Sequence, residues 1–162
     1  MTSPTEARAK DVRRSIEVPA SPAFAFAAFV HLDRWWPSEY TWSGHALVLI
    51  GMEPREGGFC YELGPNGFRC DWGRVVTWRP ASALSFTWQI GPDRTPVPDP
   101  DRASLVQLTF ANRRSSNGGV RARVDLRHDG FERYGEGGDA YATQLGGPGG
   151  WSYLLSRFRA AF

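Results

Sequence analysis

The segment from Val120 to His128 restricts the fold more than any other part of this sequence. One set of alternating positions is apolar apart from the terminal histidine, and the other set is charged. The first set is Val120, Ala122, Val124, Leu126 and His128, and the second is Arg121, Arg123, Asp125 and Arg127. This period of two predicts a β-strand with one buried face and one face in water. Such a strand belongs in an antiparallel sheet whose apolar face another element must cover.

Six further segments predict strands of the same sheet. They are residues 12–18, 46–52, 58–63, 68–78, 84–90 and 105–110. The sequence Gly-Pro-Asn-Gly at 64–67 is a strong hairpin turn, and residues 115–119 form a second turn before the last strand. The stretch 91–102 carries four prolines and three aspartates, so we expect a loop there.

Two short helical pieces are expected after the first strand. Ser21 and Pro22 form a good helix start, with Ser as the N-cap and Pro at the first helical position. The helix itself covers residues 23–30 and is rich in phenylalanine. A second piece covers 31–35 and ends there, because Pro37 disfavours helical backbone in the residue before it.

One longer helix is expected at the C-terminus. Trp151, Leu154, Leu155 and Phe158 recur at three- and four-residue spacing, which predicts a single apolar stripe on an amphipathic helix. Residues 129–150 are rich in glycine and poor in periodic apolar residues. We therefore expect a long mobile connection between the last strand and this helix.

These elements predict an α+β domain with about six or seven antiparallel strands. One terminal helix cannot cover that many strands of a flat sheet, so the sheet must curve around it. The chain holds seven Trp and ten Phe, and these bulky side chains must meet in the concave space. At 162 residues there is room for one domain, which we place at 11–162, and we expect the polar residues 1–10 to be disordered.

Charge and hydropathy argue against several functional classes. The net charge is +2 and the arginines are spread among 17 acidic residues, so we expect no nucleic-acid-binding stripe. The longest apolar run, 23–30, is too short to insert into a membrane, and the polar start of the chain does not resemble a signal peptide. We expect a cytoplasmic protein with reduced thiols. The alternative for Cys60 and Cys70 is a disulfide, should they lie on neighbouring strands.

Several short segments, in the correct order, resemble the SRPBCC superfamily of START-like, helix-grip proteins. The segments are residues 16–22, 33–37, 55–59, 72–80 and 84–88, followed by Gly150-Trp151. Within the superfamily, the chain is most similar to the branch named after the heat-shock protein 90 ATPase activator. The resemblance implies a curved sheet gripping the C-terminal helix and a cavity between them. The glycine-rich stretch before Gly150 is longer than is usual in the family, which predicts an enlarged cover at the cavity mouth.

The aromatic residues are the main candidates for the wall of this cavity. Flat apolar ligands suit aromatic walls, whose polar tips can orient them. His128 ends the last strand on its buried face and is the candidate polar anchor or acid–base group. The expected ligand-binding residues are Trp36, Tyr61, Trp72, Trp88, His128, Trp151 and Leu155. For the aromatics the competing interpretation is plain core, and for His128 it is a histidine satisfied at a strand end.

Other polar groups give weaker signals for chemistry. Glu62 and Asp71 flank the first hairpin turn and could share a proton, but we expect Glu62 to face water. His31 and His45 lack the spacing of a metal site, so we expect neither a metal nor another cofactor. The run 146–150 resembles a phosphate-binding loop only superficially, and a hinge at the helix entry explains it better.

Three functions follow, in decreasing order of support from the sequence. The first is the binding of a small hydrophobic or amphipathic molecule, without catalysis. The second is an enzyme of the polyketide-cyclase kind that orients a reactive chain in the same cavity. The third is a co-chaperone-like protein that docks on a larger partner, as the name of the branch suggests. The identity of the ligand and the oligomeric state do not follow from the sequence.

Overall fold

A computed structural model describes residues 11–162, and the disorder expected for residues 1–10 lies outside the described part. Seven antiparallel strands form one sheet in the order β1-β7-β6-β5-β4-β3-β2. The strands are β1 (Val12–Val18), β2 (Leu49–Met52), β3 (Phe59–Leu63), β4 (Arg69–Arg79), β5 (Ala83–Trp88), β6 (Ser104–Arg114) and β7 (Val120–Asp129).

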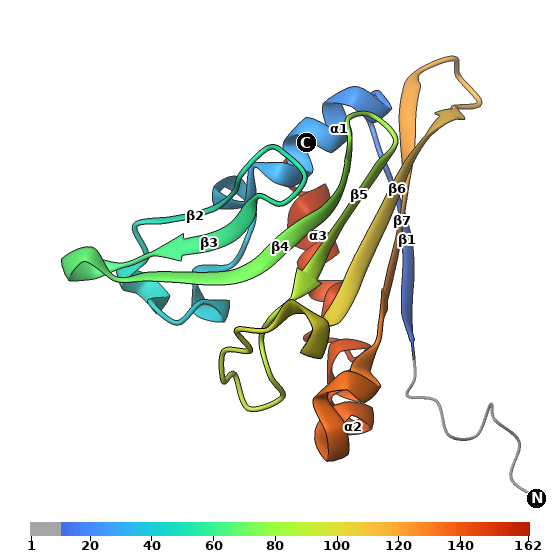
Figure 1. Ribbon diagram of the computed structural model, residues 1–162. Helices are drawn as coiled ribbons and strands as arrows, with labels where there is room; N and C mark the ends of the chain where they lie inside the picture. The colour runs from blue at the N-terminus through green and yellow to red at the C-terminus, as the bar shows by residue number, and fades with distance from the viewer. Residues whose placement is uncertain (1–10) are drawn as a thin grey trace, which may run out of the picture.

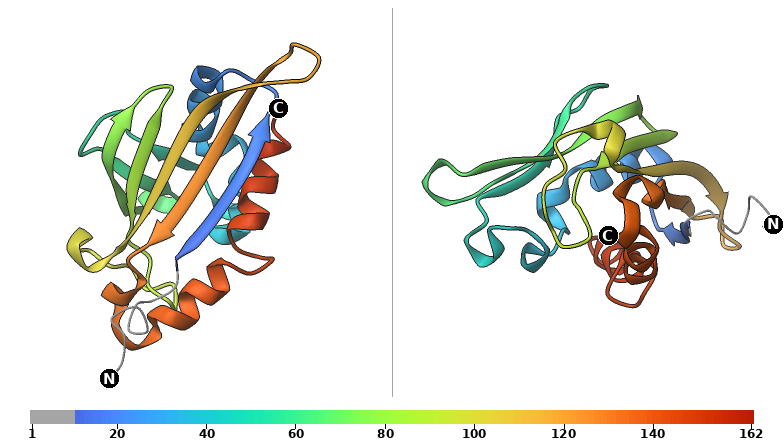
Figure 2. Two further views of the ribbon diagram at one scale, coloured as in Figure 1. Left: turned by 90° about the vertical axis from the view of Figure 1, so that its right-hand side faces the viewer. Right: turned by 60° about the horizontal axis from the view of Figure 1, so that its bottom comes forward.

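Three α-helices accompany the sheet. They are α1 (Pro22–Val30), α2 (Gly138–Leu145) and α3 (Trp151–Arg159). The sheet curls, with α1 and α3 on its concave side and α2 at one end, below β5–β7 in Figure 1. Figure 2 shows α3 running along the β1 edge. The predicted α+β helix-grip architecture is confirmed. None of the helices within residues 11–162 is long and apolar enough to cross a membrane.

The first and last strands pair along their whole length. Val12 lies opposite His128, and Val18 lies opposite Ala122. All four of these side chains are buried, because the register places the apolar face of each strand on the concave side. The pairing brings the start of the domain to the strand that leads into α2 and α3.

The first helix begins where the sequence predicts. The Ser21 hydroxyl accepts a hydrogen bond from the Phe24 backbone N–H at 3.1 Å, and Pro22 occupies the first turn. Phe26 and Phe29 are buried and meet Phe110 of β6 edge-on. The helix is thus fixed to the far end of the sheet by ring packing.

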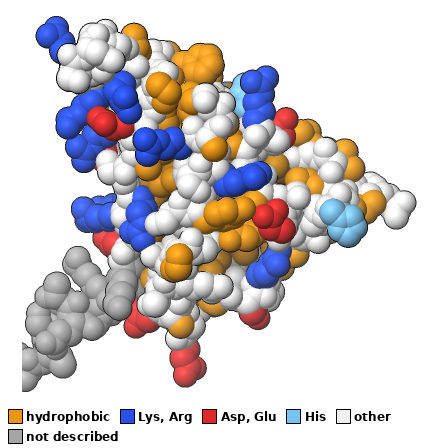
Figure 3. All heavy atoms as spheres, turned by 180° about the vertical axis from the view of Figure 1, so that it is seen from behind, with side chains coloured by type: hydrophobic (Ala, Val, Ile, Leu, Met, Phe, Trp, Pro, Cys, Tyr) orange, Lys and Arg blue, Asp and Glu red, His pale blue; other side chains and the backbone are white. Residues whose placement is uncertain are grey.

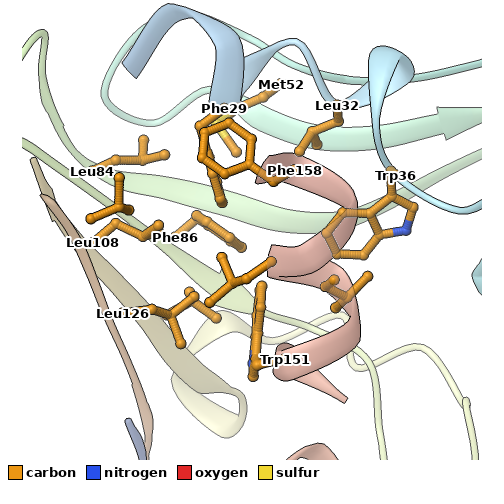
Figure 4. Close-up of a cluster of buried hydrophobic side chains, with 14 of the residues drawn as sticks. Phe29, Leu32, Trp36, Met52, Leu84, Phe86, Leu108, Leu126, Trp151 and Phe158 are labelled. Atoms are coloured by element: carbon orange, nitrogen blue, oxygen red, sulfur yellow. The ribbon is translucent and has the colours of Figure 1, made fainter. Parts of the chain in front are cut away.

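The apolar stripe of α3 fills the centre of the domain. Its four members, Trp151, Leu154, Leu155 and Phe158, are all buried. Figure 4 shows this core: Phe158 lies beside Phe29, and Trp151 stands at the opposite end of the helix, towards Leu126. The helix has only nine residues, so it covers a small part of the concave face.

The long connection predicted over 129–150 is wrong, since this segment contains two helical elements. A 3-10 segment (Phe131–Gly137) leads directly into α2, and Phe131, Tyr141 and Ala142 are buried. The glycines conceal the pattern: at Gly138 a Cβ would lie 2.1 Å from the Phe131 carbonyl oxygen, so glycine is required for this tight packing.

Both cysteines are free thiols, and the disulfide alternative does not form. Cys60 on β3 lies opposite Gly73 of β4, whereas Cys70 lies opposite Glu62. Cys60 is fully buried, and burial raises the pKa of its thiol, so this group stays protonated at neutral pH.

Candidate functional site

A cavity of about 550 Å³ opens between the end of β5, the loop that follows it, α2 and the head of α3. Its wall is mostly apolar. The aromatic members are Trp36, Tyr40, Trp88 and Tyr141, and the aliphatic ones are Ile90, Pro92, Leu145, Pro148 and Leu154. Arg94 and Gln144 supply polar side chains, and Gly147, Gly149 and Gly150 bring backbone to the mouth. The volume is in the range of small-molecule sites.

Hydrogen bonds hold the aromatic wall in place. Trp88 Nε1 donates to the Tyr141 hydroxyl at 2.7 Å, and that hydroxyl donates to the Ile90 carbonyl at 3.0 Å. These two bonds join the end of β5 to α2 across the cavity. At the mouth, the Tyr40 hydroxyl donates to the Gly149 carbonyl at 2.8 Å. The wall is therefore largely pre-formed.

The four tryptophans predicted to bind the ligand form one cluster. The Trp36 and Trp72 rings stack with centroids 5.8 Å apart, and Trp88 and Trp151 meet at 5.6 Å. Trp36 also contacts Trp88 and Trp151, at 6.0 and 6.4 Å. Only Trp36 and Trp88 reach the cavity wall, whereas Trp72 and Trp151 lie behind them as buried core.

The structure places two other predicted ligand-binding residues away from the cavity. Leu155 is buried in the core, so a larger residue there would overpack it. Tyr61 lies on β3, where the Arg69 guanidinium covers its ring at 4.7 Å. Both residues serve packing in this arrangement.

His128 occupies a buried hydrogen-bonded chain instead of the cavity wall. Trp151 Nε1 donates to His128 Nδ1 at 2.9 Å, and an indole N–H can only donate. The proton of the neutral ring must therefore sit on Nε2, which donates to the Ser104 hydroxyl at 2.7 Å. Ser104 then donates to the Tyr134 hydroxyl at 2.7 Å, and Tyr134 donates to the Trp88 carbonyl.

The surroundings of His128 keep it uncharged. The side chain is fully buried, and burial lowers its pKa from 6.5 to about 3. Phe131 lies against the ring, with centroids 4.4 Å apart. Both ring nitrogens are occupied, so this residue holds β7, β6 and the head of α3 together and does not face a ligand.

The expectation that Glu62 faces water is wrong. Its carboxylate is buried and accepts hydrogen bonds from the backbone N–H groups of Trp42 and Ser43, at 3.1 and 3.0 Å. The Ser43 hydroxyl donates a third bond at 2.8 Å. Period two does place Glu62 on the concave face, but the sequence gives no sign of a loop that folds back over it. Asp71 is exposed and pairs with Arg69 at 2.9 Å.

The remaining polar signals serve local structure. Within residues 11–162, no three His, Cys, Asp or Glu side chains gather where a metal ion could bind. His31 Nδ1 lies 2.7 Å from the Ala27 carbonyl. The run 146–150 joins α2 to α3, and a Cβ at Gly150 would lie 2.0 Å from the Leu145 carbonyl oxygen. Glycine is needed for that tight entry to α3.

Sequence reasoning missed several cavity residues: Tyr40, Arg94, Tyr141 and Gln144. Tyr141 was hidden in the glycine-rich segment, although Tyr134, Tyr141 and Leu145 follow a helical spacing. Arg94 stands in a proline-rich loop whose sequence has no periodic pattern. Its tertiary contacts alone bring it to the cavity. A curled sheet, a central helix and an aromatic cavity beside the head of that helix define a helix-grip protein.

Comparison with known proteins supports this class. No family model and no curated protein matches the sequence. Among solved structures, the anthrahydroquino-gamma-pyrone synthase Txn09, complexed with SUM, is 32% identical, with 96% of this chain and 98% of that chain covered and a TM-score of 0.65. The chain therefore belongs to the helix-grip superfamily, in the same family as this synthase.

Two more distant structures share the fold. Protein MLL2253 from Mesorhizobium loti is 14% identical, with 94% of this chain and 96% of that chain covered and a TM-score of 0.56. Protein NE0264 from Nitrosomonas europaea is 17% identical, with 93% and 92% covered and a TM-score of 0.56.

The neutral state of His128 predicts acid sensitivity. Below about pH 6.5 the unfolded chain binds a proton at this residue, whereas the folded chain excludes it until the pH approaches 3, so stability falls as the pH is lowered between these values. The slope reaches at most about 1.4 kcal/mol per pH unit. Urea denaturation of wild type and His128→Gln between about pH 4.5 and 6.5 measures it. Gln keeps one acceptor and one donor. Equal slopes in the two proteins would contradict the buried neutral histidine.

The two buried tryptophans behind the wall should respond differently to the same change. Trp72 Nε1 is buried without a hydrogen-bond partner among residues 11–162, whereas Trp151 Nε1 donates to His128. Replacing either tryptophan with Phe removes a similar amount of buried ring. Trp151→Phe also leaves the buried Nδ1 of His128 without a hydrogen-bond donor. Its free energy of unfolding should drop by about 1–3 kcal/mol more than that of Trp72→Phe. Chemical denaturation at neutral pH measures the free energy of unfolding of both variants. An equal or larger loss of stability in Trp72→Phe would refute the hydrogen bond assigned to Trp151 and His128.

Proposed function

We propose that this protein binds a flat, largely apolar aromatic molecule in the cavity beside the head of α3. The observation that carries the proposal is the wall itself. Two indole rings and two phenol rings line about 550 Å³ together with aliphatic side chains. Rings held at fixed angles suit a planar ligand, because stacking and edge contacts need little reordering.

The two tyrosine hydroxyl groups on the wall already form hydrogen bonds within the protein. The Tyr141 hydroxyl already accepts from Trp88 and donates to Ile90, and the Tyr40 hydroxyl donates to Gly149. Burial raises the pKa of Tyr141, which keeps the phenol protonated at neutral pH. A ligand would therefore meet rigid aromatic rings whose hydroxyl groups already donate their protons within the protein. This favours binding and orientation over acid–base chemistry by these hydroxyls.

A second function, a cyclase-like enzyme using the same cavity, is favoured by the 32% identity to the gamma-pyrone synthase. Forming a γ-pyrone from an ortho-hydroxyaryl β-diketone needs the phenol oxygen to attack the distal carbonyl carbon, followed by loss of water. A rigid cavity can promote such a ring closure by holding the chain in its folded conformation, without a dedicated catalytic base.

The other expectations drawn from the sequence remain predictions. These are membership of the ATPase activator branch, a co-chaperone-like partner and a cytoplasmic location. On the face shown in Figure 3, basic side chains stand in several places with acidic and apolar ones between them. That mixture gives a docking partner no single charge to recognise, and we rank this function last.

Blocking the cavity mouth should weaken ligand binding without unfolding the domain. Gly149 lines the mouth, and a Cβ there would make only an ordinary contact with the Tyr40 hydroxyl, at 3.6 Å. Gly149→Trp should weaken binding of a neutral anthraquinone carboxamide by about tenfold or more, as the indole fills the space of the ligand. Isothermal titration calorimetry measures the affinity.

The matched control makes the same change elsewhere. Gly119 lies in the β6–β7 turn, where a Cβ would lie 3.4 Å from Asn117 Oδ1. Gly119→Trp should bind like wild type. Unchanged affinity in a folded Gly149→Trp variant would refute this binding site, and no binding by wild type to any flat aromatic probe would refute the function.

For the cyclase function, the expected result is faster chromone formation from an ortho-hydroxyaryl β-diketone. Wild type should exceed the buffer rate by about tenfold or more, because orientation alone contributes that much to ring closures. Absorbance of the chromone follows the reaction, with Gly119→Trp and Gly149→Trp as the active and blocked controls. A rate equal to buffer, with the diketone shown to bind, would leave a binding protein and remove the enzyme.

A further inference from the structure

Among residues 11–162, Arg94 is the single charged residue on the wall of the cavity, and no carboxylate from that part of the chain shares the wall. None of the ion pairs within residues 11–162 involves it. Its neighbour Asp93 instead accepts a hydrogen bond from the Thr95 backbone N–H at 3.3 Å. The apolar cavity thus carries one positive charge that pairs with no carboxylate of the described residues.

The fold fixes the position of this arginine. Its backbone has a φ of +65°, in the left-handed region that residues other than glycine rarely adopt. Arg94 Nη2 donates to the Thr41 carbonyl at 3.0 Å, and Trp42 Nε1 donates to the Arg94 carbonyl at 2.9 Å. Two bonds between the same two loops hold both ends of the residue.

The loop that holds Arg94 is itself held by the buried carboxylate of Glu62. That group accepts the backbone N–H bonds of Trp42 and Ser43, and hydrogen bonds to a carboxylate are stronger than neutral ones. Arg94 is therefore placed at the mouth by a chain of contacts that starts inside the sheet. One of its guanidinium N–H groups is used for this purpose, and none of the described residues accepts from the others.

A second source of positive potential lies beside the same cavity. The N-terminus of α3 begins at Trp151, no side chain caps its first turn, and the preceding Gly149 and Gly150 line the wall. A helix N-terminus carries about half a positive charge. Arg94 and its neighbour Asp93 both lie near enough to Tyr141 to act on its phenol: burial raises the pKa of that group, Arg94 lowers it and Asp93 raises it.

We infer that the cavity selects planar aromatic compounds that carry an anionic oxygen group, with that group at Arg94 and the rings against Trp36 and Trp88. Carboxylates, phenolates and enolates share this chemistry. The inference rests on the proposed aromatic binding and adds the charge of the ligand to it. An arginine contacts such a group through parallel N–H bonds, while the apolar wall accepts the ring system.

The experiment compares two probes of the same shape, an anthraquinone carboxylate and the corresponding carboxamide. Wild type should bind the carboxylate about three- to tenfold more tightly, the range for an arginine–carboxylate contact at a partly open site. In Arg94→Gln this ratio should fall towards one, with only the weaker contribution of the α3 N-terminus left, while the affinity for the carboxamide stays the same. Arg94→Lys should keep part of the ratio, because it retains the charge but not the planar pair of donors.

Arg102 provides the matched control. It stands in the same proline-rich loop, in the 3-10 turn Pro100–Arg102, and does not line the cavity. Arg102→Gln removes one positive charge from the loop and should keep the wild-type ratio. A ratio retained in Arg94→Gln, or lost equally in Arg102→Gln, would overturn the inference while leaving aromatic binding intact. Binding of neither probe by wild type would overturn the proposed function and this inference with it.

Discussion

Nine residues of α3 must cover the concave face of a seven-stranded sheet, and most other features of the molecule follow from that shortage of cover. The sheet curls towards the helix, α1 fills one end with phenylalanine rings, and four tryptophans fill the centre. Beyond the head of α3, the 3-10 segment Phe131–Gly137 packs against β6, and α2 lies at the end of the sheet. The cavity opens at that point because the aromatic layer continues past the element that covers it.

The buried polar chain through His128 fixes the end of the domain where the cover is thin. It links the head of α3 to β7, β6, the 3-10 segment before α2 and the end of β5. Every member donates in one direction, so the chain works only with a neutral histidine. The same Trp88 that receives its last bond also forms the cavity wall and donates to Tyr141. The hydrogen bonds of this buried chain therefore keep the cavity wall rigid, although they lie behind it.

What could be predicted from the sequence depends on whether a residue's place is set by local pattern. The strict alternation over 120–128 and the stripe of α3 are local, and both elements form as expected. The cluster of four tryptophans was also predicted, because large rings on the concave face of a curved sheet must pack against one another. Which of them reach the cavity was not predictable, since Trp36 and Trp72 stack on each other and only one faces the open space.

The residues that sequence reasoning missed are those placed by long-range contacts. α2 was hidden because the glycines before it suggest a mobile connection, whereas its own first residue, Gly138, serves close packing. Glu62 follows the strand period correctly, yet its burial depends on a loop twenty residues away.

Arg94 combines both difficulties: its loop has no period, and its position comes from Thr41 and Trp42. A charged residue in an irregular loop carries no local signal of function. In this fold the irregular loops meet at the cavity mouth, so the residues that distinguish one ligand from another are those least visible in the sequence.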